Sequence, residues 1–221
     1  MTLESAKIMG GVGSLLVVIG GIVSFRAPFV SLLGLVGIIL ILIALHNMAD
    51  FYGERGIFSN ALYAFIVGII GAVAFIGTLV VALITFLSSL PSWAQPYVNA
   101  RDWQGLGTAF RQHITNLSSF WSVFGSVVLT LVIALVVLCV FLVIAMFFFR
   151  RSLVQLSAKT NVDFFGTTGL LMLVGAILTI VLVGFLIIWI GWILLTIAFF
   201  SIRETAPAQP TSMNPPPAPT Q

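Results

Sequence analysis

Charged side chains are scarce in this sequence of 221 residues. They make up 7% of the chain, and hydrophobic residues make up 60%, whereas soluble domains are about 25% charged. Too few polar side chains are present to cover the surface of a water-soluble fold, so the composition excludes that class. The sequence therefore predicts an all-α integral membrane protein, with the lipid bilayer as its first partner.

Chemical motifs are also scarce. Cys139 is the single cysteine, which excludes an intrachain disulfide and a cysteine metal site. The chain lacks the serine-hydrolase, zinc-protease and P-loop motifs and has no paired intramembrane aspartates. No ionisable residue falls in the middle of a predicted span, although ion-coupled transporters usually need one. The formal charge of +3 indicates topology rather than nucleic-acid binding, and no cofactor is expected.

A long uncharged run lies between Asp163 and Arg203. As one helix it would extend roughly 55–60 Å, about twice the ~30 Å hydrocarbon thickness of a bilayer. We predict a hairpin of two membrane helices that turns near Val183-Gly184-Phe185. The alternative, a single long helix, would push the apolar residues 193–202 into water.

Residues 1–204 are predicted to form a bundle of six spans. These spans are residues 8–25, 29–45, 61–87, 119–149, 165–182 and 185–202. Six spans place both termini on one side, together with six of the nine basic residues, and the positive-inside rule makes that side cytoplasmic. The proline-rich tail, residues 205–221, is uncharged and is predicted to be disordered.

Two pairs of segments suggest an internal duplication. Residues 15–24 align with 170–179 at four identical positions of ten, and residues 37–45 align with 191–199 at five of nine. The offsets, 155 and 154, differ by one residue at the turn. Glycines align in both blocks. The pattern predicts that the first and last hairpins arose by duplication.

The outer loop, residues 88–118, carries aromatic residues at membrane-interface spacing. Trp93 and Tyr97 are predicted interfacial anchors. Trp103 and Phe110 belong to a set of apolar residues repeated at three- and four-residue steps, which predicts an amphipathic helix on the membrane surface. A loop helix packed on its own bundle is the alternative.

Two further groups are expected to act through packing or charge. Ala64, Gly68 and Ala72 form a small-residue face on the third span, suited to helix contact. Arg150 and Arg151 end the fourth span. They are expected to anchor it at the cytoplasmic interface and are candidates for binding an anionic lipid headgroup.

His46, Asp50 and Glu54 are the candidate metal ligands. Their spacing of four residues would place them on one face of a continuous helix, and these residue types bind metals. Gly53 and Gly56 argue against such a helix. We favour a polar cap in a loop after the second span, with Asp50 or Glu54 near Arg55.

Several stretches carry a family resemblance. Ala49-Asp50-Phe51-Tyr52 and Asn60-Ala61-Leu62-Tyr63 lie within residues 34–65, and Gly184-Phe185-Leu186-Ile187-Ile188-Trp189-Ile190-Gly191-Trp192 lies near the end of the apolar region. Together they resemble domain-of-unknown-function family nine-nine-six, a largely archaeal group of multi-pass membrane proteins. The resemblance covers residues 1–204. It implies an archaeal cell membrane and no particular chemistry.

These observations favour a non-enzymatic membrane scaffold or accessory subunit that acts through helix packing, as a homo-oligomer or with a partner subunit. The first alternative is a channel or transporter for a small neutral or lipid-like solute. A membrane enzyme using the residues of the candidate metal site is the second alternative.

Overall fold

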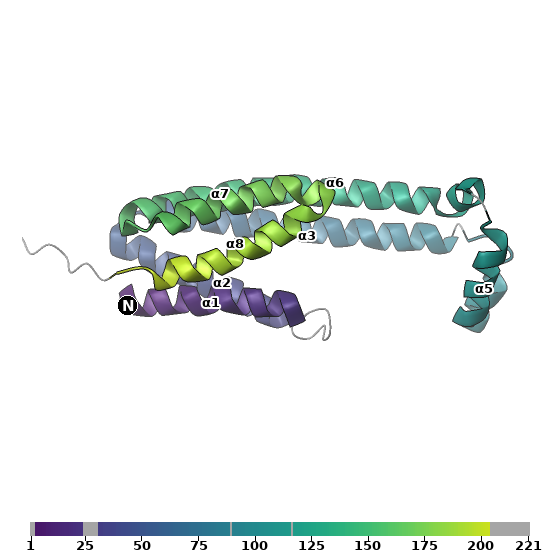
Figure 1. Cartoon of the computed structure of the whole chain (residues 1–221), viewed down its shortest axis with the longest axis horizontal. Coiled ribbons are helices and arrows are strands. Elements are labelled where there is room, and N and C mark those ends of the chain that lie inside the picture. Colours follow the sequence, from purple (N-terminus) through teal and green to yellow (C-terminus); the bar gives the residue numbers. More distant parts are fainter. Residues whose placement is uncertain (1–2, 24–30, 89, 116, 204–221) are drawn as a thin grey trace, which may run out of the picture. The chain divides into compact units, whose positions relative to one another are not determined.

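The chain is mostly helical in the part that the computed structural model describes, residues 3–23, 31–88, 90–115 and 117–203. No strand occurs among these residues (Figure 1). The helices are α1 (Leu3–Val23), α2 (Ser31–Tyr52), α3 (Arg55–Ser88), α4 (Gln95–Ala100), α5 (Trp103–His113), α6 (Leu117–Thr160), α7 (Asp163–Leu178) and α8 (Val183–Phe200), and the short 3₁₀ helix η2 (Thr179–Val181) follows α7. The predicted disordered tail, residues 205–221, lies outside the described residues.

Six of the helices are long and apolar enough to cross a membrane. They are α1, α2, α3, α6, α7 extended by η2, and α8. This confirms the prediction of an all-α membrane protein with six candidate spans. Except at its ends, a helix pairs its backbone N–H and C=O groups within itself, which a lipid environment requires.

The second helix is longer than predicted. We expected a loop over residues 46–60, but α2 continues to Tyr52 and α3 begins at Arg55, so the loop prediction was wrong except at Gly53 and Glu54. The helix ends where Gly53 takes a left-handed conformation, with φ of 64°, as glycine often does after a helix. Polar side chains at the end of α2 therefore lie on a helix rather than in a loop.

The chain divides into two compact units, which are described separately. Unit 1 contains Met1–Phe58, Leu153–Thr168 and Trp192–Gln221, and unit 2 contains Ser59–Ser152 and Gly169–Gly191.

In unit 1, α1 and α2 lie side by side (Figure 1). Their crossing is close because glycines face each other. A Cβ added to Gly13 would lie 2.7 Å from the Gly37 carbonyl oxygen, and one added to Gly20 would lie 2.9 Å from the Gly34 nitrogen. Backbones approach this closely only where side chains are absent.

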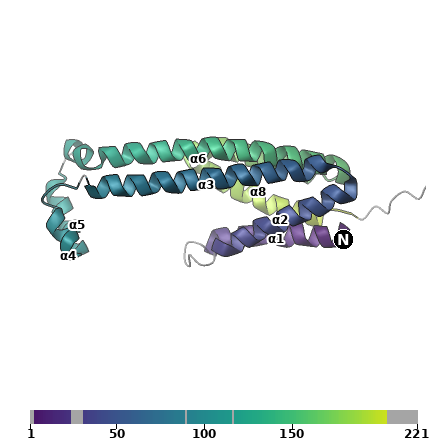
Figure 2. The same ribbon diagram turned by 180° about the vertical axis from the view of Figure 1, so that it is seen from behind.

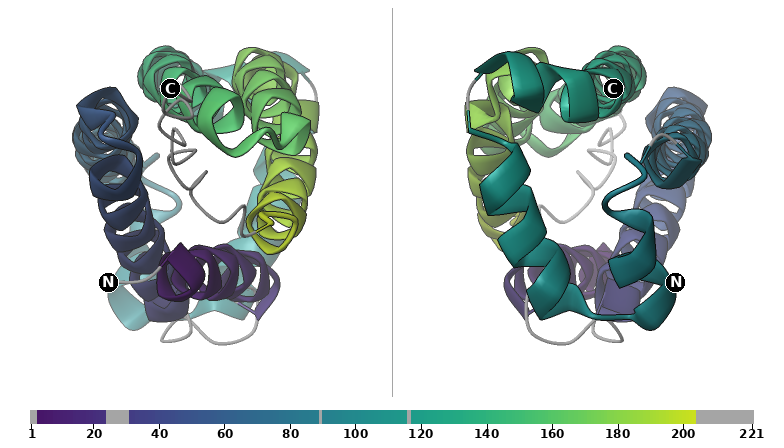
Figure 3. Two further views of the ribbon diagram at one scale, coloured as in Figure 1. Left: turned by 90° about the vertical axis from the view of Figure 1, so that its left-hand side faces the viewer. Right: turned by 90° about the vertical axis from the view of Figure 1, so that its right-hand side faces the viewer.

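In unit 2, α3 and α6 run side by side (Figure 2). The Phe141 ring covers Gly71, where an added Cβ would lie 2.5 Å from the Phe141 Cβ. Toward the other end, the Phe86 and Phe124 rings stack with centroids 5.8 Å apart. The short helices α4 and α5 run across the direction of α3 and α6 (Figures 2 and 3).

The α7–α8 segment is a hairpin, as predicted, and the single long helix is excluded. The turn lies at η2 and Leu182, just before the predicted position. Leu182 has φ of 65°, and its amide donates to the Thr179 carbonyl oxygen at 2.9 Å. Gly184, which we assigned to the turn, instead packs directly against the backbone of Gly175 and Thr179. Its lack of a side chain serves helix contact.

The helix contacts support the duplication of the two hairpins. In each hairpin, a glycine of the first helix lies close to a backbone nitrogen of the second helix. The distance from an added glycine Cβ to that nitrogen is 2.9 Å in the α1–α2 hairpin and 3.0 Å in the α7–α8 hairpin. A glycine of the second helix likewise lies close to a side chain of the first helix. The distance from an added glycine Cβ to that side chain is 2.9 Å in the α1–α2 hairpin and 2.6 Å in the α7–α8 hairpin. The matching pairs are Gly20–Gly34 with Gly175–Ile188, and Gly37–Val17 with Gly191–Met172. Their members are related by the same offsets, 155 and 154, that align the sequences.

Candidate functional site

The polar residues at the end of α2 lie on the helix surface. The His46 Nε2 and Asp50 Oδ2 atoms are 3.6 Å apart, and the side chains are 53% and 70% exposed. The His46 ring also contacts the Phe58 ring, with centroids 4.7 Å apart. This arrangement agrees with a polar cap at the end of the span.

Glu54 does not complete a metal site with His46 and Asp50. It lies in the break between α2 and α3, and its carboxylate contacts the Lys159 Nζ at 3.5 Å. Within the residues that the structure covers, no group of three His, Cys, Asp or Glu side chains could hold a metal ion. The sequence pointed to Arg55 as the neighbouring cation and missed Lys159, because that residue is distant in the chain.

Lys7 makes a second long-range contact that the sequence did not indicate. Its Nζ donates to the Ile202 carbonyl oxygen at 2.8 Å. The last carbonyl groups of a helix lack partners within it and carry partial negative charge. Lys7 of α1 therefore satisfies a backbone acceptor just beyond α8.

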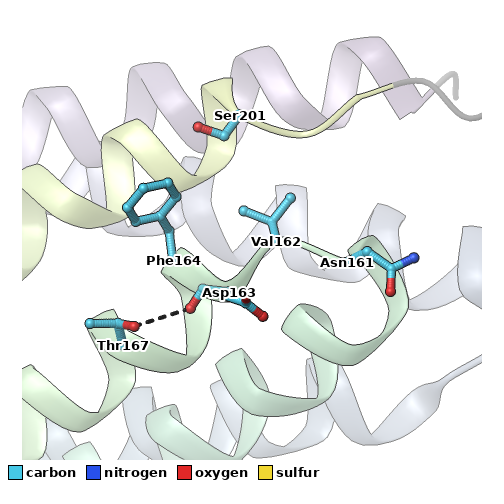
Figure 4. Close-up of a pocket in the computed structure, with 6 residues that line it drawn as sticks. All are labelled: Asn161, Val162, Asp163, Phe164, Thr167 and Ser201. Atoms are coloured by element: carbon cyan, nitrogen blue, oxygen red, sulfur yellow. Dashed lines mark hydrogen bonds between the residues drawn. The ribbon is translucent and has the colours of Figure 1, made fainter.

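A cavity of about 390 Å³ lies at the start of α7 (Figure 4). The residues that line it are Asn161, Val162, Asp163, Phe164, Thr167 and Ser201. The Thr167 hydroxyl donates to the Asp163 carbonyl oxygen at 3.3 Å, and the Ser201 hydroxyl donates to the Ile197 carbonyl oxygen at 2.8 Å. Its volume suits a small molecule, but both hydroxyl donors already bond to their own helices.

The predicted packing face of α3 is used only in part. Ala64 is buried, whereas Ala72 is exposed, and a Cβ added to Gly68 would have nothing within 4 Å. The close contact with α6 is made at Gly71 instead. Gly71 lies outside the predicted series of residues four apart, so spacing alone did not find it.

The outer-loop aromatics divide between two roles. The Trp93 ring stacks on His113 and meets Phe110 edge-on, with centroid distances of 4.3 and 5.0 Å. The Phe110 ring in turn contacts Phe124 of α6 at 5.6 Å, as expected for a loop helix packed on its bundle. Trp103 is 67% exposed, and its place at the membrane interface stays a prediction. Tyr97 accepts the Asp102 amide at its carbonyl oxygen, at 2.9 Å.

Arg150 and Arg151 lie within α6, ten and nine residues before its end at Thr160. Arg150 packs along Gly169 of α7, where an added Cβ would lie 3.1 Å from the Arg150 Cα. The Arg151 guanidinium carbon lies 5.8 Å from the centroid of the Phe147 ring. The two arginines are thus partly held by protein rather than simply extended from the helix.

Six apolar helices of spanning length define this chain as a multi-pass membrane protein. It belongs to the family described as "Protein of unknown function (DUF996)", whose pattern matches residues 33–193, and this confirms the resemblance in the sequence. The chain is 26% identical over 204 residues to an uncharacterized protein of Methanocaldococcus jannaschii, covering 92% of this chain and 95% of that one. No solved structure matches this chain.

Proposed function

We propose that the protein is a non-enzymatic scaffold or accessory subunit of the cell membrane that acts through helix packing. The observation that carries this proposal is the contrast among its glycines. Five glycines of the two hairpins lie against backbone atoms of the adjoining helix or turn, namely Gly13, Gly20, Gly37, Gly175 and Gly184, whereas Gly68 of α3 has nothing within 4 Å of an added Cβ. Exposed Ala72 lies one turn further along the same face. A second copy of the chain or a partner helix would fit there, because small residues allow close approach in lipid.

We expect Gly68→Leu to dissociate the complex that the wild-type protein forms in mild detergent. The added side chain would separate the two helix backbones at the contact. Native mass spectrometry and chemical crosslinking, applied to protein in native-like membranes and after purification, measure the stoichiometry. A wild-type protein that is strictly monomeric and carries no partner would contradict the proposal.

Gly77→Leu is the matched control. Gly77 also has nothing within 4 Å of an added Cβ, and it lies nine residues further along α3. Nine residues turn a helix by two and a half turns, so Gly77 lies on the opposite face. This variant should keep the wild-type stoichiometry, and an equal loss in both variants would indicate a general effect on α3.

The proposal also places both chain ends in the cytoplasm, because the predicted cytoplasmic side carries six of the nine basic residues. A reporter enzyme that works only in the cytoplasm should be active when it is fused after Gln221. The matched fusion within the outer loop, at Gly107, should give the opposite signal. A clear external signal from the fusion after Gln221 would contradict this orientation, which requires an even number of spans.

A channel or transporter for a small neutral or lipid-like solute is the second candidate. The repeated contacts of the two hairpins favour it, since many transporters are built from internal repeats. The Thr168 hydroxyl is buried and has no hydrogen-bond partner among the described residues, which offers one polar group to such a solute. This candidate predicts solute flux across vesicles containing the wild-type protein, whereas the scaffold role predicts none.

A further inference from the structure

Arg150 and Arg151 have no carboxylate to neutralise them in unit 2. The acidic residue that unit 2 contains in its sequence is Asp102. Its carboxylate is engaged at the start of α5, where Oδ1 accepts the Gly105 amide at 2.8 Å. Neither arginine side chain has a hydrogen bond or an ion pair within the described part of the chain. Two positive charges therefore lack a counter-charge from their own unit.

The Arg150 side chain is held between α6 and α7. A Cβ added to Gly169 would lie 3.1 Å from the Arg150 Cα and 3.2 Å from its Cγ, so the stem runs along the surface that this glycine leaves open. The Nε atom is buried and has no hydrogen-bond partner among the residues that the structure describes. A buried donor without an acceptor is costly, more so on a charged group, which points to an acceptor outside the chain.

Arg151 adds a second cation at the same depth. Neighbouring residues of a helix differ by only about 1.5 Å along its axis. The Arg151 guanidinium is held 5.8 Å from the Phe147 ring centroid, a distance suited to a cation–π contact. That contact leaves its N–H groups free to bind an anion beside Arg150.

The position of the pair in the sequence indicates the source of the anion. No Asp, Glu, Lys or Arg occurs between Arg111 and Arg150, so the two arginines stand where the apolar part of α6 ends. Lipid phosphates lie at that level of a bilayer. Guanidinium groups match phosphate oxygens through paired hydrogen bonds.

We propose that Arg150, with Arg151 as the second cation, binds the phosphate of an anionic phospholipid headgroup between α6 and α7. The site does not depend on the scaffold role, because a lipid bound there would serve a transporter equally well. Because Gly169 has no side chain, it leaves room for the aliphatic part of the Arg150 side chain. The net charge of the pair favours an anionic lipid over a zwitterionic one.

The test uses the full chain, stripped of lipid in mild detergent and titrated with phosphatidylglycerol, phosphatidylcholine or inorganic phosphate. Native mass spectrometry measures the bound lipid, and the midpoint of thermal unfolding measures the linked stabilisation. We expect phosphatidylglycerol to bind and to raise the midpoint, with little effect from phosphatidylcholine. Arg150→Gln should weaken phosphatidylglycerol binding roughly ten- to hundredfold, since a hydrogen bond to a charged group contributes about 1.5–3 kcal/mol.

Arg111→Gln is the matched control, because it removes the same charge from an exposed position in α5. It should bind phosphatidylglycerol as the wild-type chain does. Arg150→Lys keeps the positive charge but loses the planar guanidinium that pairs with phosphate oxygens. This variant should bind phosphatidylglycerol with intermediate affinity, and it provides a test if Arg150→Gln fails to fold. Equal binding by the Arg150→Lys chain and the wild type would overturn the site. Equal retention of both lipids, or equal stabilisation by inorganic phosphate, would overturn its assignment to an anionic lipid.

Discussion

Gly184→Ala is expected to disrupt the α7–α8 hairpin and to leave little folded protein in mild detergent. The new Cβ would overlap the Gly175 carbonyl oxygen and the Thr179 amide nitrogen. Both are backbone atoms in helical turns, so neither can rotate away as a flexible side chain would. Overpacking of this kind typically costs about 1–3 kcal/mol and sometimes more. The better helix preference of alanine returns only about 1 kcal/mol.

Thermal unfolding followed by circular dichroism, together with the yield of monodisperse protein, measures the effect of Gly184→Ala. Leu182→Gly in the same turn is the control. Leu182 has a positive φ of 65°, a conformation that costs an ordinary residue roughly 1–2 kcal/mol and glycine little. This variant should unfold at the same temperature as the wild type or slightly above it. A Gly184→Ala protein as stable as the wild type would show that the hairpin separates more easily than its contacts indicate.

Gly37→Ala is expected to lower the free energy of unfolding by roughly 2–3 kcal/mol. Its added Cβ would lie 2.5 Å from the Gly13 carbonyl oxygen and 2.9 Å from the Val17 Cγ2. The α1 and α2 backbones would have to separate along their whole crossing to accommodate it. Reversible unfolding in mixed micelles, monitored by circular dichroism against the fraction of denaturing detergent, gives the difference from the wild type.

Gly34→Ala tests the same helix with the opposite expectation. A Cβ added to Gly34 would meet nothing within 4 Å, and the residue lies three positions before Gly37. The substitution should be neutral or stabilise α2 by up to about 1 kcal/mol through helix preference. If both variants lost stability equally, the effect would come from glycine loss in α2 generally and not from the crossing with α1.

The spans could be predicted because each is fixed by local properties of the chain. The uncharged segment before Arg203 is too long for one crossing, and this length alone gave the hairpin. The position of its turn could not be predicted from residue type. Glycine is the usual residue for a left-handed turn, but Leu182 takes that conformation while Gly184 is needed for the contact with Gly175.

The contacts between distant segments were not predictable. The Glu54–Lys159 and Lys7–Ile202 contacts join residues more than 100 positions apart, and no local pattern identifies them. The sequence predicts a loop after Leu45 because polar residues gather there and because Gly53 and Gly56 argue against a continuous helix. The structure continues α2 through them, since no residue before Gly53 interrupts the helical hydrogen bonds.

The lengths of α3 and α6 set this protein apart from a bundle of uniform helices. At 1.5 Å per residue, the 34 residues of α3 and the 33 residues of α6 that precede Arg150 each measure about 50 Å, whereas the 18 residues of α8 measure about 27 Å. Helices of unequal apolar length cannot all match one bilayer at the same inclination, so the longer pair must tilt or the surrounding lipid must stretch. The protein should therefore respond to acyl-chain length and gather where the membrane is thickest.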